Sequence, residues 1–133
     1  MKVDELQLYD WVFGIDGAGN RHPCIIAAID IYPTNKSPRI VTLGGYGYQE
    51  ENLEPIPFTE KLLQPNGFHR TEGYFVFEDD YYDLTIHLIS DSIWLISYHN
   101  CEINLPDERI MFSYVHELQH FLRHCKIEKK IFI

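Results

Sequence analysis

Cysteine and long apolar runs are both scarce in this sequence. Its three cysteines, Cys24, Cys101 and Cys125, are odd in number, widely spaced and without a C-x-x-C pair. This pattern argues against a disulfide framework and against a cysteine-based zinc site. The longest apolar run, residues 25–29, has the length of a strand and is far short of the roughly 18 residues that a membrane span needs. We therefore expect free thiols in a cytoplasmic protein with no membrane association.

Positive charge is also in short supply. The 133 residues contain 11 Lys and Arg against 20 Asp and Glu, a formal net charge of -9. Such a chain repels phosphate backbones, so generic nucleic-acid binding is not expected. Acidic residues gather in three runs, at 50–54, 78–80 and 107–108. We expect these runs to form solvated loops, and the binding role that they favour is contact with a protein partner that carries a basic surface.

The signatures of several enzyme classes are missing. No G-x-S-x-G elbow occurs, and no glycine-rich turn opens a helix as it does in dinucleotide-binding proteins. Gly44, Gly45 and Gly47 are not followed by a Lys-Ser/Thr pair, so they predict a bend or bulge in a strand rather than a phosphate loop. Asp79, Asp80 and Asp83 lack the spacing and the glycine of a calcium loop, so they do not predict a calcium site.

Short strand-like segments separated by turn residues fill the first part of the chain. This pattern is typical of a small SH3-like β-barrel. The predicted strands cover residues 6–13, 24–32 and 40–43, with a turn at 16–20.

Two prolines mark the end of this strand region. Pro55 and Pro57 force an extended crossing and forbid a helix before Thr59. We place a boundary there, which divides the chain into an SH3-like strand region at 1–57 and a second, α+β region at 58–133.

The second region predicts an antiparallel β-meander between two helices. Thr59 is suited to cap a short helix over residues 60–64, which Asn66-Gly67 would end. Ser113 is suited to cap a final helix that runs to about Cys125 and packs across the sheet. The fold class is therefore α+β. The predicted meander strands are 73–77, 82–89 and 92–98, followed by an interrupted strand over 100–112 with its break at Pro106-Asp107.

The final helix contains the pattern H-E-x-x-H, as His116-Glu117-Leu118-Gln119-His120. On a helix this spacing places two imidazoles on one face, where they can bind zinc, while the glutamate acts as general base on a zinc-bound water. A minimal zinc-dependent metallohydrolase, with His116 and His120 as metal ligands and Glu117 as the catalytic base, is therefore one hypothesis for function.

The helical pattern favours a different interpretation of the same residues. One apolar stripe of the helix would face the core, and His116, His120 and His124 fall on the opposite side, which we expect to meet water. His124 is about 12 Å from His116 along the helix and cannot share its metal. A third ligand would have to come from elsewhere, and nothing in the sequence brings one over the helix. We therefore expect no catalytic residue, no metal ligand and no cofactor. The distant candidates are His22, His69, His87 and His99.

Four motifs resemble those of an uncharacterised family of small prophage and mobile-element proteins of gut anaerobes. Such sequences have an opening L-x-x-G-D/N-W/Y-V strand, a P-I-P-L-T segment, an N-G-F turn and a closing Y-V-H-x-L-Q helix. Tyr9 stands where these sequences usually have Gly, and Lys126 stands where a Gly often ends the helix. The matching segments here are Leu8-Tyr9-Asp10-Trp11-Val12, Pro55-Ile56-Pro57-Phe58-Thr59, Asn66-Gly67-Phe68 and the helix that begins Tyr114-Val115-His116.

The resemblance implies that the final helix serves packing or recognition. Family members carry Gln at the position of Glu117 and Asn at that of His120, and a zinc hydrolase tolerates neither change. Together with the acidic runs, this favours a noncatalytic accessory or interaction protein of a mobile element or prophage. The tyrosines expected at its aromatic and acidic contact surface are Tyr46, Tyr48, Tyr81 and Tyr82.

Overall fold

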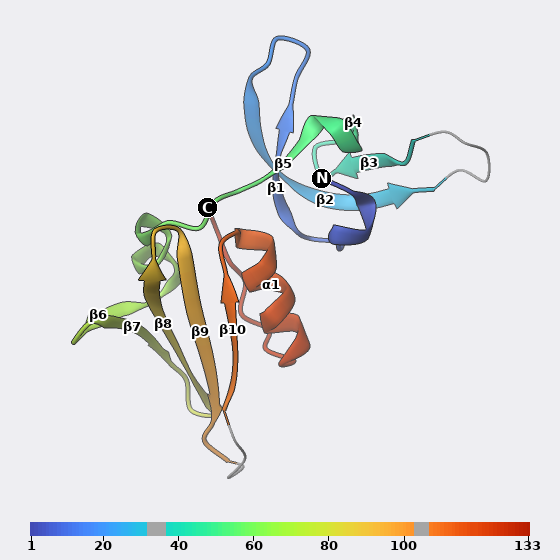
Figure 1. Ribbon diagram of the computed structural model, residues 1–133. Helices are drawn as coiled ribbons and strands as arrows, with labels where there is room; N and C mark the ends of the chain where they lie inside the picture. Colours follow the sequence, from blue (N-terminus) through green and yellow to red (C-terminus); the bar gives the residue numbers. More distant parts are fainter. Residues whose placement is uncertain (32–36, 103–106) are drawn as a thin grey trace. The chain divides into compact units, whose positions relative to one another are not determined.

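The computed structural model describes residues 1–31, 37–102 and 107–133. The chain forms two compact units, Met1–Ile56 (unit 1) and Pro57–Ile133 (unit 2). Each unit contains a five-stranded antiparallel sheet, and unit 2 also contains the α-helix α1 (Val115–His124; Figure 1). The protein is therefore of the α+β class, as the sequence pattern predicts.

The sheet of unit 1 has the strand order β4-β3-β2-β1-β5. Its edge strands β4 and β5 are not paired with each other among the described residues, so the sheet is open. A 3₁₀ helix, η2, lies between these two edge strands in the sequence, and another, η1, precedes β1. The elements are η1 (Val3–Glu5), β1 (Trp11–Ile15), β2 (Arg21–Asp30), β3 (Arg39–Thr42), β4 (Gly47–Gln49), η2 (Glu50–Asn52) and β5 (Leu53–Pro55).

The first predicted strand is wrong at its start, because β1 begins at Trp11 rather than at residue 6. Tyr9 has a φ of 70°, a left-handed conformation that interrupts an extended strand. The backbone N–H of Gln7 donates a hydrogen bond of 2.8 Å to Oδ2 of Asp10. This local turn keeps the residues before Trp11 out of the sheet.

Strand β2 takes part in both halves of this sheet. Its first half pairs with β1 as far as Ile25, and its second half pairs with β3 from Ile26 onward. A shift in register lies between Ile26 and Ala28. Such an irregularity bends a strand and increases its twist, so one long strand can serve two differently oriented halves.

Unit 1 has a small core, and hydrogen bonds from Met1 connect the start of the unit to its end. The N-terminal ammonium of Met1 donates hydrogen bonds to the backbone carbonyls of Glu50 at 3.0 Å and Leu53 at 2.9 Å. These bonds attach the chain's start to η2 and β5. The buried core residues are Leu6, Val12, Ile26, Ile40 and Leu53.

The sheet of unit 2 is a meander in which the strands follow one another in sequence order. The three meander strands predicted at 73–77, 82–89 and 92–98 are confirmed as β7, β8 and β9. The elements are η3 (Glu60–Leu62), η4 (Gln64–Asn66), β6 (His69–Thr71), β7 (Tyr74–Glu78), β8 (Tyr82–Ser90), β9 (Ile93–Asn100), β10 (Glu108–Phe112) and α1 (Val115–His124).

Two predicted elements of unit 2 differ in the structure. The short helix expected at 60–64 is instead a pair of 3₁₀ turns, because Pro65 has no N–H to continue a helix and Gly67 ends the second turn with a φ of 87°. Of the interrupted strand expected at 100–112, the described residues place Asn100 at the end of β9 and form a separate strand, β10, at Glu108–Phe112. The predicted break is at Pro106-Asp107, and Pro106 lies outside the described residues.

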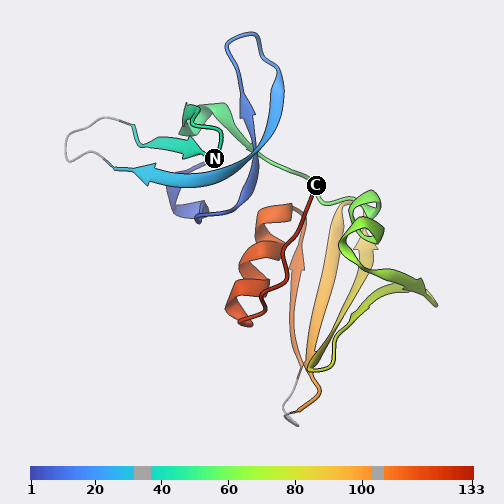
Figure 2. The same cartoon turned by 180° about the vertical axis from the view of Figure 1, so that it is seen from behind.

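The helix α1 and the C-terminal segment complete the core of unit 2. Both views show α1 beside β10, with the last residues running back along the helix (Figures 1 and 2). The ring of Phe58 meets Trp94 edge-on at 5.3 Å and Phe112 at 5.1 Å between centroids. The buried side chain of Asn66 fixes the C-terminal segment, since it exchanges two hydrogen bonds of 2.8 Å with the backbone of Phe132.

Candidate functional site

The H-E-x-x-H motif lies in the first turns of α1. The helix has Tyr114 as its N-cap, one residue after the predicted Ser113. Oε1 of Glu117 accepts hydrogen bonds of 3.0 Å from the backbone N–H groups of both Ser113 and Tyr114. A carboxylate in this position satisfies donors at the helix start and complements the helix dipole. The carboxylate of Glu117, which is the general base in the metallohydrolase hypothesis, therefore caps the start of the helix.

The prediction that the polar face of α1 meets water is wrong for part of that face. His116 is 7% exposed and Gln119 is 8% exposed. His120 is half-buried, and only His124 is exposed, with its Nε2 3.4 Å from Oε2 of Glu108.

Ring packing along the helix is one physical reason for this difference. The Tyr114 ring stacks on the His116 imidazole at 6.0 Å, and the His120 ring meets His116 edge-on at 5.5 Å. Each ring removes part of its neighbour from solvent. A helical wheel records only which side of the helix a residue occupies, and it does not account for neighbouring rings that cover one another.

The described part of the chain contains no group of three or more His, Cys, Asp or Glu side chains that could hold a metal ion. Two of the distant histidines have carboxylate partners instead: His22 Nε2 lies 2.7 Å from Asp16, and His99 Nδ1 lies 2.8 Å from Asp107. A catalytic zinc ion needs three protein ligands. Among the described residues, no third such side chain is grouped with His116 and His120.

The four predicted contact tyrosines occur as two pairs in different units. Tyr46 is 71% exposed and precedes β4 in unit 1, while Tyr81 is 61% exposed and precedes β8 in unit 2. Tyr48 and Tyr82 are half-buried. The Tyr82 ring packs against Phe77 at 6.0 Å between centroids, so it belongs partly to the interior of unit 2.

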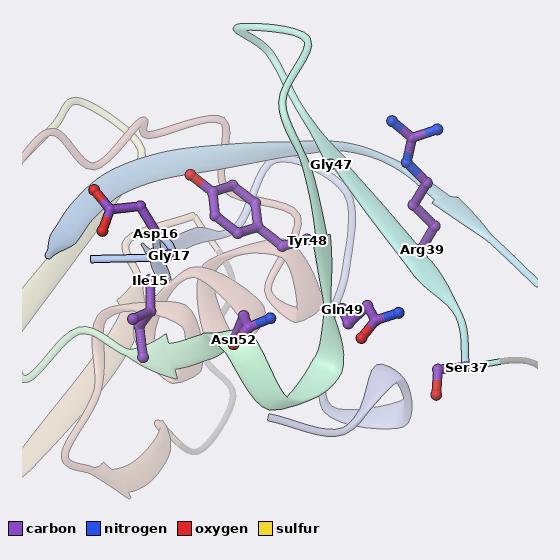
Figure 3. Close-up of a pocket in the computed structure, with 9 residues that line it drawn as sticks. All are labelled: Ile15, Asp16, Gly17, Ser37, Arg39, Gly47, Tyr48, Gln49 and Asn52. Atoms are coloured by element: carbon purple, nitrogen blue, oxygen red, sulfur yellow. The ribbon is translucent and has the colours of Figure 1, made fainter. Parts of the chain in front are cut away.

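Two hollows in unit 1 meet at Tyr48. The first, of about 710 Å³, has Arg39 in its wall and opens between the β1–β2 turn, β4 and η2 (Figure 3). The second, of about 570 Å³, is lined mainly by apolar and aromatic side chains that include Trp11 and Tyr46. We call the second the Tyr48 hollow. Tyr48 and Asp16 line both hollows, so the two are neighbours on unit 1.

The β1–β2 turn brings a carboxylate to these hollows. Oδ1 of Asp16 accepts hydrogen bonds of 2.9 Å from the backbone N–H groups of Ala18 and Asn20, and Oδ2 faces His22. These contacts, with the His22 hydrogen bond the largest and the Asn20 backbone next, lower the pKa of Asp16 to about 2. Asp16 is therefore ionised at neutral pH.

The hydroxyl of Tyr48 lies within the field of that carboxylate. In Figure 3 it points toward Asp16, while Arg39 lies on the other side of Gly47. Loss of solvent raises the pKa of Tyr48 first, and the negative charges of Cys24, Asp16 and Tyr46 raise it further. The surroundings of the Tyr48 hydroxyl thus disfavour negative charge.

A second cluster of carboxylates lies at one end of the unit 2 sheet. The strand registers place it there: Glu78 is opposite Asp83 and Asp83 is opposite His99, close to the β7–β8 turn that exposes Tyr81. We call this cluster the acidic end of unit 2. Its described members are Glu78, Asp79, Asp80, Asp83, Glu102, Asp107 and Glu108.

The acidic end contributes to the raised pKa of a neighbouring thiol. Desolvation is the largest cause that raises the pKa of Cys101, followed by the negative charges of Asp83, Glu102 and Glu78. Three separate carboxylates therefore contribute to one local field. The pairing of Asp107 with His99 balances only part of that charge when His99 is protonated.

The sequence pattern missed the hollows of unit 1, although two strand glycines mark them. An ideal Cβ on Gly14 would lie 2.4 Å from the Tyr48 ring, and one on Gly47 would lie 2.4 Å from Nε of Arg39. A glycine within a strand indicates that another group approaches the backbone closely. Both glycines therefore point to side chains that line the hollows.

Comparisons with known proteins yield no relative: no protein-family model, no curated protein and no solved structure matches this chain. Among the described residues, no helix has the length and apolar character to cross a membrane.

Proposed function

We propose that this protein is a noncatalytic interaction protein that binds a protein partner with a basic surface. The observation that carries this proposal is the acidic end of unit 2, where carboxylates on the strand ends and on the β7–β8 turn lie in the same region as the exposed Tyr81. Aromatic side chains supply contact area in protein interfaces, and surrounding charge selects and orients the partner. The net charge of -9 favours basic partners and disfavours bare nucleic acid.

We also propose an SH3-like arrangement for unit 1. Support comes from the long, bent β2 that serves both halves of the sheet, from the 3₁₀ helix η2 just before β5, and from the pairing of β5 with β1. Scaffolds of this kind present loops and turns to ligands in many unrelated proteins, which is an analogy at the level of fold. The two hollows at Tyr48 lie beside such loops.

The proposed setting is the cytoplasm of a cell that carries the gene on a prophage or another mobile element. Three cysteines without a disulfide support a reducing compartment. The mobile-element origin is supported by the motif resemblance alone. Integrase, portal or conjugation genes beside the coding sequence would be the matching genomic observation, and a housekeeping operon would contradict it.

Site-specific photocrosslinking tests the partner proposal. The full-length chain carrying p-benzoylphenylalanine in place of Tyr81 is expressed in the source cells and irradiated. We expect one prominent adduct with a basic protein. The adduct should weaken in the double variant Glu78→Gln, Asp80→Asn and persist in Asp4→Asn, Glu5→Gln, which removes the same charge from exposed positions in unit 1. No adduct, or equal loss in both double variants, would overturn the proposal.

A further inference from the structure

The Tyr48 hollow combines aromatic rings with one fixed carboxylate. Trp11, Tyr46 and Tyr48 line its volume of about 570 Å³, and Asp16 stands in the same wall. The face of an aromatic ring carries negative electrostatic potential and attracts a cation that lies within about 6 Å of its centre. Three rings, one from β1 and two from the β3–β4 hairpin, therefore line a place suited to positive charge.

The carboxylate of this hollow is held in position by the fold. Oδ1 of Asp16 binds two backbone N–H groups of the β1–β2 turn, so its location follows from the hairpin itself. The Arg39 guanidinium lines only the neighbouring hollow and not this one. Of the residues that line the Tyr48 hollow, His22 alone can become positively charged, and it already faces Asp16 at 2.7 Å.

We propose that the Tyr48 hollow takes the cationic end of an arginine or lysine side chain from the protein partner. This inference rests on the proposed function, since it names the chemistry by which a basic partner is held on unit 1. The apolar walls, with Leu43 and Ile25 among them, suit the methylene stem, while the rings and Asp16 face the charge. A neutral side chain of the same length would keep the stem contacts and lose the attraction of the charge.

Short peptides test the hollow directly, because they supply the cationic side chain without the rest of a partner. The ¹⁵N-labelled full-length chain is titrated with acetyl-Gly-Arg-Gly-amide and with the same peptide carrying citrulline, the uncharged isostere of arginine. We expect saturable shifts at the Trp11 indole and at the amides of Leu43 and Tyr46. Citrulline should bind roughly five- to tenfold more weakly, as expected for the loss of a partly desolvated cation–π contact. Equal affinity for the two peptides would overturn the proposal.

Two matched tyrosine variants locate the site. Tyr46→Leu removes an exposed ring of the hollow and should weaken the arginine peptide severalfold. Tyr74→Leu removes an exposed ring in unit 2 that belongs to neither proposed binding surface, and it should leave the affinity of the arginine peptide unchanged. Unchanged binding in Tyr46→Leu, or shifts that map only to Asp79 and Asp80, would place the cation elsewhere and overturn the inference.

The two proposals fail separately. If the Tyr81 crosslink forms and the arginine peptide does not bind the hollow, the partner proposal stands and the hollow does not hold a cation. If the peptide binds the hollow and no crosslink forms, the hollow is a cation site and the acidic end of unit 2 is not the partner surface.

Discussion

Gly14 lies directly beneath the ring of Tyr48, so closely that an ideal Cβ on Gly14 would be 2.4 Å from Cζ of that ring. Gly14 belongs to β1 and Tyr48 to β4, which occupy different positions in the sheet of unit 1. The absence of a side chain at one position thus decides where the ring stands at the other. Both hollows of unit 1 depend on that placement, because Tyr48 lines each of them.

The substitution Gly14→Ala should displace the Tyr48 ring and destabilise unit 1. Forcing a methyl group into a filled position typically costs about 1–3 kcal/mol. Chemical denaturation gives the free energy of unfolding, and the NMR signals of the Tyr48 ring report its movement. Gly17→Ala is the matched control, since nothing lies within 4 Å of an ideal Cβ there. Equal stability of the two variants would contradict the close contact.

The pairing of Asp16 with His22 should be visible in the titration of Asp16. Its pKa is about 2, below the ordinary 3.8, and the His22 hydrogen bond is the largest cause. A carboxyl group with a lowered folded-state pKa stabilises the fold fully above its ordinary pKa, and this contribution is lost as the pH falls toward 2. In His22→Ala the pKa of Asp16 should rise toward 3.8, as measured by carbon NMR of the carboxyl group.

The control for this titration is His124→Ala, which removes a histidine paired with Glu108 in unit 2. This substitution should leave the pKa of Asp16 unchanged. A pKa that stays at about 2 in His22→Ala would show that the turn N–H groups of Ala18 and Asn20 alone hold the carboxylate.

Much of the strand pattern could be predicted, because local residue preferences determine it. The meander strands β7 to β9 follow from β-branched and aromatic runs between clear turn residues such as Asp79 and Asp91. The start of β1 could not be predicted from such preferences. The residues before it have strand-forming side chains, and the left-handed backbone of Tyr9 overrides them.

Glu117→Ala should destabilise unit 2 by about 1 kcal/mol, because the carboxylate caps the start of α1 by accepting hydrogen bonds from two backbone N–H groups. Glu117→Gln retains an acceptor oxygen and should cost less. Denaturation of both variants measures the difference, with Glu128→Ala as an exposed control after the helix. A neutral effect of Glu117→Ala would refute the capping role and would make the carboxylate free for other chemistry.

The candidate site was less predictable than the fold, since it depends on contacts between distant segments. The spacing of His116 and His120 places both imidazoles on one helical face, yet the burial of His116 depends on what packs against that face. The hollow at Tyr48 brings together β1, β2, the β3–β4 turn and β4, and no local pattern joins these segments. Tyr46 and Tyr48 could be chosen as contact residues only because exposed aromatic side chains beside acids favour binding.

Lys126→Gly should stabilise the protein by roughly 0.5–1 kcal/mol, because a left-handed backbone strains a residue that has a side chain. Glycine also increases the entropy of the unfolded chain, which offsets part of this gain. Lys126 has a φ of 58° and follows Cys125, the C-cap of α1. The helix ends there with the paired bonds of a Schellman motif: the N–H of Ile127 donates to Leu122 at 2.9 Å, and that of Lys126 donates to Arg123 at 3.0 Å. Lys130→Gly is the matched control, because it removes the same charge from an exposed position outside regular structure. In thermal and chemical denaturation, Lys126→Gly should be more stable than the parent chain, and Lys130→Gly should be equally or less stable. The reverse order would mean that the left-handed residue at the helix end carries no strain.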